Sequence, residues 1–106
     1  MKIKFNLLAL VCASVMAPAA WAASPEDALT AGQCMACHAK DKKMVGPSFK
    51  DIAAKYKGQS GAAAKLIEKV RKGGSGSFGA LPMAPNGPDK INDSDLKAVI
   101  EYILKS

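Results

Sequence analysis

The stretch Cys34-Met35-Ala36-Cys37-His38 places two thiols and one imidazole within five residues. On a helix, residues at i, i+3 and i+4 share one face, so both sulfurs and the ring would point to the same side. Such a face suits a flat macrocycle, because the sulfurs can bond vinyl groups on one porphyrin edge while the imidazole reaches beneath the iron. The C-x-x-C-H pattern therefore predicts covalent attachment of one c-type haem.

Three other interpretations explain less of this motif. A structural zinc site needs four ligands, and only Cys34, Cys37 and His38 remain if Cys12 belongs to a cleaved leader. A thioredoxin-like dithiol is expected near strands, and no run of Val, Ile or aromatic residues beyond the leader predicts one. A disulfide across so short a loop gains little loop-closure entropy and leaves the histidine unexplained.

The first 22 residues have the pattern of a secretory signal peptide. Lys2 and Lys4 form a basic n-region, an apolar run follows, and residues 20–22 are the small-residue cleavage site Ala-Trp-Ala. A membrane anchor is less favoured, because the run is short and is interrupted by polar residues and a proline. We predict cleavage of residues 1–22, one domain over residues 23–106, and export to the periplasm without stable membrane insertion.

A domain of this size, about 84 residues, buries only a modest core and commonly needs a staple, metal or cofactor. Covalent haem would supply that centre. Export fits the same chemistry, because free thiols outside the cytoplasm would otherwise oxidise.

The chain carries a net charge of +6, and without the leader it has thirteen basic against nine acidic side chains. Six lysines crowd the segment after the haem motif, and they are Lys40, Lys42, Lys43, Lys50, Lys55 and Lys57. They form either a solvated face or a docking field for an acidic redox partner, which would speed association and weaken with salt. A nucleic-acid partner is not expected, because no binding motif is present and aromatic residues are few.

Helix caps and apolar periodicity predict an all-α fold. The expected helices span about residues 25–34, 48–57, 60–72 and 93–105, and the last should cross the first to close the domain. The expected core residues are Ala28, Leu29, Ala31, Phe49, Ile52, Ala53, Tyr56, Ala63, Leu66, Ile67, Val70, Leu96, Val99, Ile100, Tyr102 and Ile103.

Met83 lies in a loop that two nearby prolines stiffen. His38 is the only histidine, so a six-coordinate iron needs a second axial ligand of another type, and His/Met ligation is typical of electron carriers. Met35 lies within the attachment turn and Met44 only six residues past His38, whereas Met83 is 45 residues away. We therefore predict that His38 and Met83 are the two axial ligands, and that no residue is catalytic.

Taken together, these segments resemble a small bacterial class I cytochrome c of the cytochrome c-551/c-552 type. The resemblance rests on C-M-A-C-H at 34–38, Met-Val-Gly-Pro at 44–47, Lys-Asp-Ile-Ala-Ala-Lys-Tyr at 50–56 and Leu-Pro-Met-Ala-Pro-Asn at 81–86. It implies the class I cytochrome c fold, with about four short helices around one covalent haem c. It also implies a periplasmic monomer, not an enzyme, that carries single electrons between respiratory membrane complexes and terminal reductases or oxidases.

The resemblance further implies two supporting contacts. The carbonyl of Pro47 should accept the ring proton of His38, and Asn86 should lie near the sulfur of Met83. From spacing alone, residues 46–47 are equally compatible with a simple turn.

The chain departs from the family pattern at two places. Phe78 stands where many relatives carry a tryptophan that bonds a haem propionate, so we expect Lys69 or Arg71 to replace that donor. Residues 87–91 form a longer segment than in the shortest relatives. The rival function is a haem enzyme or gas sensor with one open iron position, which would bind carbon monoxide rapidly when reduced.

Overall fold

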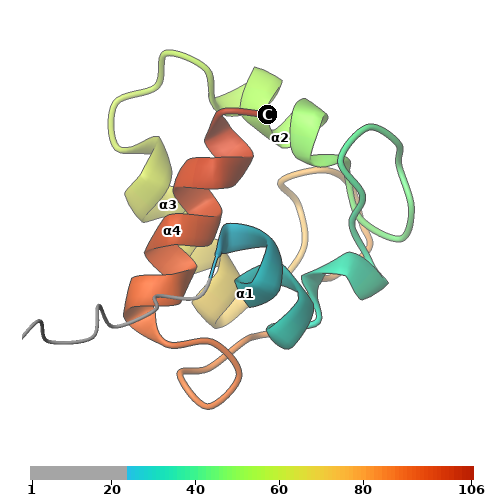
Figure 1. The fold of residues 1–106 in the computed structure, drawn as a ribbon. Coiled ribbons are helices and arrows are strands. Elements are labelled where there is room, and N and C mark those ends of the chain that lie inside the picture. The colour runs from blue at the N-terminus through green and yellow to red at the C-terminus, as the bar shows by residue number, and fades with distance from the viewer. Residues whose placement is uncertain (1–23) are drawn as a thin grey trace, which may run out of the picture.

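The computed structural model describes residues 24–106, so the predicted signal peptide over residues 1–22 lies outside the described residues. The described chain forms α1 (Pro25–Ala31), a short 3-10 helix η1 (Cys34–Ala36), α2 (Phe49–Tyr56), α3 (Ala62–Lys72) and α4 (Asp93–Leu104), as Figure 1 shows. Within residues 24–106 the chain has no named strand, and a single antiparallel bridge joins Gly74 to Met83. The predicted all-α fold with four helices is confirmed.

Side-chain caps set the beginnings of three helices. Ser24, Ser48 and Asn92 each accept a hydrogen bond from the backbone N–H three residues further on, at 3.2, 3.0 and 2.8 Å respectively. Each cap satisfies one of the N–H groups that the first turn leaves without an intrahelical partner. Helices α1, α2 and α4 therefore begin within a residue of their predicted positions.

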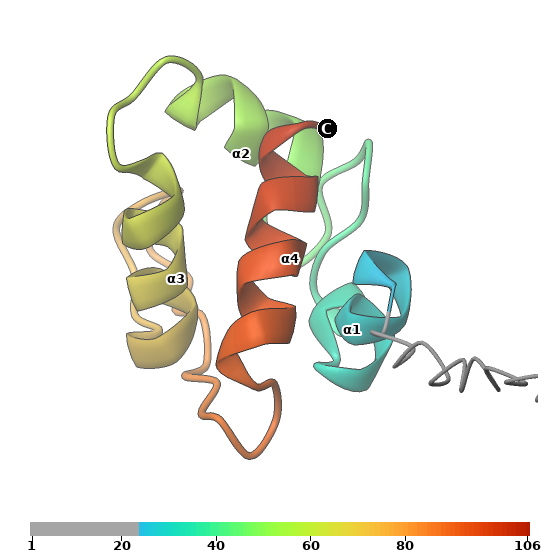
Figure 2. The ribbon, with the colours of Figure 1, turned by 60° about the vertical axis from the view of Figure 1, so that its left-hand side comes forward.

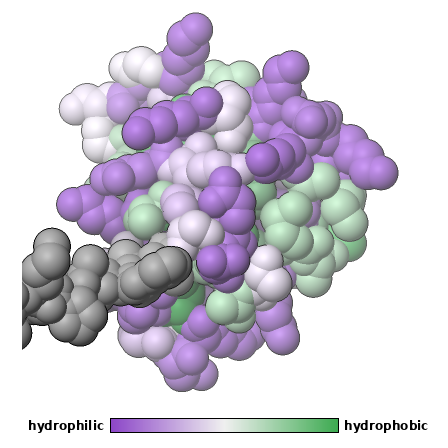
Figure 3. Space-filling view, in the orientation of Figure 1, coloured by the Kyte–Doolittle hydropathy of each residue, from purple (hydrophilic) through white to green (hydrophobic). Residues whose placement is uncertain are grey.

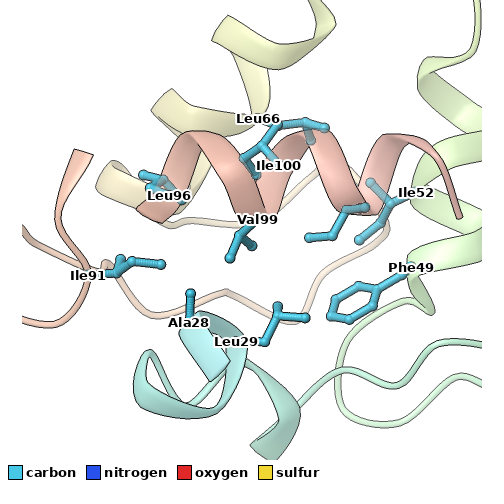
Figure 4. Close-up of a cluster of buried hydrophobic side chains, with 10 residues drawn as sticks. Ala28, Leu29, Phe49, Ile52, Leu66, Ile91, Leu96, Val99 and Ile100 are labelled. Carbon is cyan, nitrogen blue, oxygen red and sulfur yellow. The ribbon is translucent and has the colours of Figure 1, made fainter. Parts of the chain in front are cut away.

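Helix α4 is the centre of the fold and contacts α1, α2 and α3. In Figure 2 it lies between α1 and α3, while α2 packs near its C-terminal end. Figure 4 shows its apolar face meeting side chains from the other three helices. The core cluster consists of Ala28, Leu29, Phe49, Ile52, Leu66, Ile91, Leu96, Val99, Ile100 and Ile103.

The end of α1 corrects one prediction. We expected this helix to reach Cys34, but it ends at Ala31, where Gly32 closes the last turn by donating its N–H to the Ala28 carbonyl. Gln33 then takes a left-handed backbone conformation with φ of 58°. The chain therefore leaves the helix axis before the haem motif, and Ala31 is exposed rather than inward.

The start of α3 is also later than predicted, at Ala62 rather than about residue 60. The residue before it, Gly61, has φ of 73°, which an L side chain adopts only with strain. Within α3 only Leu66 of the four predicted core residues is fully buried, and Ala63, Ile67 and Val70 are partly buried against the core.

Ile91 is a core residue that the periodicity did not reveal, because it precedes α4 rather than belonging to it. It lies one position before the Asn92 cap, and both Ile91 and Leu96 are buried in the same cluster. This pairing of the residue before the cap with the fourth helical residue is a hydrophobic staple. Over residues 24–106, no helix has the length and apolar character needed to cross a membrane.

Candidate haem site

The six predicted site residues all line one cavity of about 540 Å³. They are Cys34, Cys37, His38, Pro47, Met83 and Asn86. Helices α2, α3 and α4 supply apolar lining, including Phe49, Leu66, Val99 and Ile100. The volume lies within the usual range for sites that take a cofactor or other small molecule, roughly 300–1,000 Å³.

The two thiols and the imidazole project from one tight turn. The backbone N–H groups of Cys37 and His38 both donate to the Cys34 carbonyl, at 3.2 and 3.0 Å. The expected i, i+3, i+4 arrangement therefore exists, although it is built on η1 and not on a continuation of α1. Both cysteines are free; Cys37 is exposed, whereas burial raises the pKa of the half-buried Cys34 thiol.

His38 is held by its Nδ1 atom, which lies 2.7 Å from the Pro47 carbonyl oxygen. A carbonyl can only accept, so Nδ1 donates this hydrogen bond, and Nε2 is the ring nitrogen left available to a metal. The ring also stacks on Phe49, with ring centroids 5.8 Å apart. Gly46 sits so close that a Cβ there would lie 2.5 Å from Cε1 of the ring, so this position admits no side chain without movement.

Met83 is fixed through its backbone. Gly74 and Met83 each donate an N–H to the other's carbonyl, both at 2.9 Å, and this pair closes the loop between them. Gly73 has φ of 66°, and a Cβ there would lie 2.4 Å from the Met83 carbonyl. Met83 is half-buried and lines the cavity, whereas Met35 and Met44 are 41% and 42% exposed and do not line it.

Asn86 holds the chain just after Met83. Its side-chain amide donates to the Ala84 carbonyl at 2.9 Å, and its backbone N–H donates to the Val70 carbonyl at 2.9 Å. The predicted closeness of Asn86 to the Met83 sulfur stays a prediction. What the geometry shows is that Asn86 ties the 83–86 segment to the end of α3.

Arg71 has a role that the sequence did not reveal. Its Nη1 donates to the carbonyls of Asn86 and Ile91 at 3.1 and 2.8 Å, and its Nη2 pairs with Asp93 at 2.6 Å. The guanidinium therefore joins α3 to both ends of the segment before α4. No sequence pattern marks these contacts, because their main acceptors are backbone carbonyls 15 and 20 residues away.

The donor set and the cavity fit a haem. The turn offers two thiols at i and i+3 and an imidazole whose free nitrogen is Nε2, and the loop offers a thioether. The site and the helices around it define a small class I cytochrome of the kind that binds haem c.

Comparison with known proteins leads to the same class. Residues 27–106 match the Cytochrome c family. The chain is 51% identical over 84 residues to cytochrome c2 of Rubrivivax gelatinosus, covering 79% of this chain and 99% of that protein. It is 40% identical over 101 residues to cytochrome c-551 of Pseudomonas aeruginosa, covering 94% of each. The crystal structure of wild-type cytochrome c552 from Nitrosomonas europaea superposes with a TM-score of 0.70 at 42% identity, covering 76% of this chain and 96% of that one.

The chain belongs to the cytochrome c family. It therefore carries one covalently attached haem c and serves as an electron carrier rather than an enzyme.

Proposed function

We propose that this protein is a periplasmic, monomeric, monohaem electron carrier that shuttles single electrons between respiratory membrane complexes and terminal reductases or oxidases. Cys34 and Cys37 form the two thioether bonds to the haem, and His38 and Met83 are its axial ligands. When bound, the haem iron supplies a one-electron couple between Fe(II) and Fe(III).

The observation that carries the ligand assignment is the position of Met83. Among the methionines of residues 24–106, Met83 alone lines the cavity that Cys34, Cys37 and His38 also line. A thioether is a soft, uncharged donor, and in His/Met pairs it raises the reduction potential. With both axial positions filled by side chains, no substrate binds at the metal.

Pro47 and Asn86 support the two proposed iron ligands, Pro47 at His38 and Asn86 at Met83. The Pro47 carbonyl fixes the tautomer and orientation of His38, so Nε2 is the nitrogen presented to iron. Asn86 fixes the backbone that follows Met83 through its bonds to Ala84 and α3. The apolar lining between them keeps water away from the metal.

For the propionate contact, the geometry favours Lys69 over Arg71. All three donor contacts of Arg71 described above go to backbone carbonyls and Asp93, so its guanidinium is committed. Lys69 lines the cavity, and its Nζ would lie 3.6 Å from a Cβ placed at Gly74. We therefore assign Lys69 the donor role that Phe78 cannot fill.

The surface around the attachment turn suits a redox partner. Met35, Met44 and Val45 are exposed large apolar residues, and Figure 3 shows an apolar area on the right-hand side, where Figure 1 draws η1 and the loop after it. The lysines of the predicted docking field are also exposed. We propose that the apolar area contacts the partner near the haem edge and that the lysines steer acidic partners toward it.

Visible spectra of the purified protein test this function. We expect a low-spin c-type spectrum in both oxidation states, a long-wavelength methionine-to-iron band in the oxidised state, and a mass above that of the polypeptide. Met83→Ala should abolish the band and lower the potential, while Met44→Ala, which removes an exposed methionine, should leave both unchanged.

Three results would overturn parts of the proposal. Rapid carbon monoxide binding by the reduced wild-type protein, without the methionine band, would favour the rival with an open iron position. A native band in Met83→Ala would remove Met83 as a ligand. An electron-transfer rate that does not change with ionic strength would exclude electrostatic docking.

A further inference from the structure

The loop that carries Met83 is fastened firmly at its base. The paired hydrogen bonds between Gly74 and Met83, both 2.9 Å, close the base, and Gly73 donates to the Lys69 carbonyl of α3 at 2.7 Å. The tip of this loop, residues 76–79, is closed on itself by a 2.8 Å bond from the Gly76 N–H to the Gly79 carbonyl. These contacts shape the loop, but none of them attaches its tip to a helix.

One side chain makes that attachment, and it comes from α2. The ammonium group of Lys55 donates to the Ser77 carbonyl, and the same group lies 4.4 Å from the centroid of the Phe78 ring. Ser77 and Phe78 also line the cavity, together with Tyr56 of α2. Lys55 therefore joins α2 to the loop tip at the cavity wall, 22 residues away in sequence.

We propose that Lys55 is a positioning residue for the axial methionine: it ties the tip of the 74–83 loop to α2 and so keeps Met83 on the iron. This inference rests on the proposed ligation by Met83. Without the tie, the tip can swing about a base that is held at Gly73, Gly74 and Met83, and water can enter beside the thioether. Lys55 acts through the loop and does not touch the iron.

The interaction at Phe78 explains why the tip needs a cation. Phe78 is 42% exposed, so burial alone does not hold it, but its ring face attracts an ammonium group within about 6 Å. The Ser77 carbonyl next to it provides an acceptor for the same group. A cation on the last turn of α2 thus satisfies both neighbours at once, and this removes Lys55 from the freely solvated lysines of the docking field.

Loss of the methionine-to-iron band on raising the pH of the oxidised holoprotein provides the test. We expect Lys55→Gln to raise the equilibrium constant for loss of the band roughly two- to fivefold, the order of one exposed cation–π contact, and so to lower the pH midpoint of the loss. Lys57→Gln is the matched control, because Lys57 lies just past the same helix end, carries the same charge, is exposed, and has no hydrogen bond or ion pair with another described side chain. The control should keep the wild-type midpoint.

Two further variants separate positioning from general stability. Lys55→Arg should restore the wild-type midpoint, since a guanidinium also donates and stacks on an aromatic face. Phe78→Leu should lower the midpoint as Lys55→Gln does, and the double variant should lower it little further, because both remove the same contact. The Tm followed by the helical circular dichroism should change little. Expressed as free energies, the loss in global stability should be much smaller than the shift in the pH midpoint of the band.

The outcomes distinguish failure of the proposed Met83 ligation from failure of the proposed role of Lys55. If the wild-type protein shows no methionine band, the proposed ligation fails and this inference falls with it. If the wild-type band is present but Lys55→Gln behaves like Lys57→Gln, the ligation stands and the role of Lys55 is refuted. If Lys55→Gln changed the free energy of global unfolding as much as the free energy of band loss, the role would also be refuted, because such a result indicates a purely structural residue.

Discussion

Gly46→Ala tests how tightly the fold holds His38. Gly46 has no positive φ, so alanine can adopt its backbone conformation, and the effect of the change comes from the added methyl group alone. That group would lie 2.5 Å from Cε1, 2.9 Å from Nδ1 and 3.1 Å from Nε2 of the imidazole. The first two distances are shorter than real Cβ contacts, so either the ring or the loop must move.

Neither can move freely. The ring is held by the 2.7 Å bond to Pro47 and by stacking on Phe49, while the Gly46 N–H donates to the Cys37 carbonyl at 2.8 Å. Overpacking of a tight site costs about 1–3 kcal/mol, and a lost hydrogen bond adds about 0.5–1.5 kcal/mol. We expect a loss of about 2–4 kcal/mol in the free energy of unfolding, or roughly 10–25 °C in Tm for a domain of this size.

Thermal unfolding of the holoprotein, followed by circular dichroism alongside the visible spectrum, measures both effects. Gly58→Ala is the control: Gly58 has φ of 74° and nothing within 4 Å of its Cβ position, so it should cost about 1–2 kcal/mol of backbone strain with an unchanged spectrum. Gly46→Ala should instead alter the spectrum as well as the Tm. A Gly46→Ala protein with wild-type Tm and spectrum would show that the ring is not confined as described.

Three further predictions concern stability. Arg71→Gln leaves two carbonyls without their donor and should cost about 2–4 kcal/mol of unfolding free energy in chemical denaturation. Asp93→Asn should cost under about 1 kcal/mol, because the Asp93 side chain is 92% exposed. Equal losses in the two variants would show that the carbonyl contacts of Arg71 do not contribute more than its ion pair. The ammonium group one turn along α3 lowers the pKa of the Glu68 carboxyl, so this ion pair stabilises the fold above pH 4.5 and the contribution is lost as the pH falls through the lowered value. A Glu68→Gln variant should therefore show a slightly flatter dependence of Tm on pH in that window, and a steeper one would refute the assignment. The double variant Cys34→Ser/Cys37→Ser, which cannot form the thioethers, should lose most of its helical circular dichroism, and a cooperative wild-type transition in it would count against a haem-dependent fold.

The helices and the turn at residues 34–38 could be predicted from the sequence because local chemistry determines them. Ser24, Ser48 and Asn92 are cap residues whose effect reaches only three residues along the chain. The C-x-x-C-H turn is equally local. Even the error at the end of α1 had a local signal, since a glycine at position 32 is a common helix terminator.

The supports of the site could not be predicted in the same way. Arg71 binds carbonyl groups, which every residue carries, so nothing in the sequence distinguishes its acceptors at 86 and 91. The crowding at Gly46 depends on where the loop brings it against the His38 ring, and the tie from Lys55 to Phe78 joins segments far apart in the chain. These are tertiary contacts, and only the folded arrangement identifies them.

The core and the haem cavity are one structure, because they share their walls. Eight of the buried core residues also line the cavity, and these are Phe49, Ile52, Leu66, Ile91, Leu96, Val99, Ile100 and Ile103. If no cofactor filled this space of about 540 Å³, these apolar side chains would face water, and exposed apolar area disfavours the folded state. With the proposed attachment at Cys34 and Cys37, haem therefore completes the core as well as the redox site, because the apolar residues that hold the helices together also line its cavity.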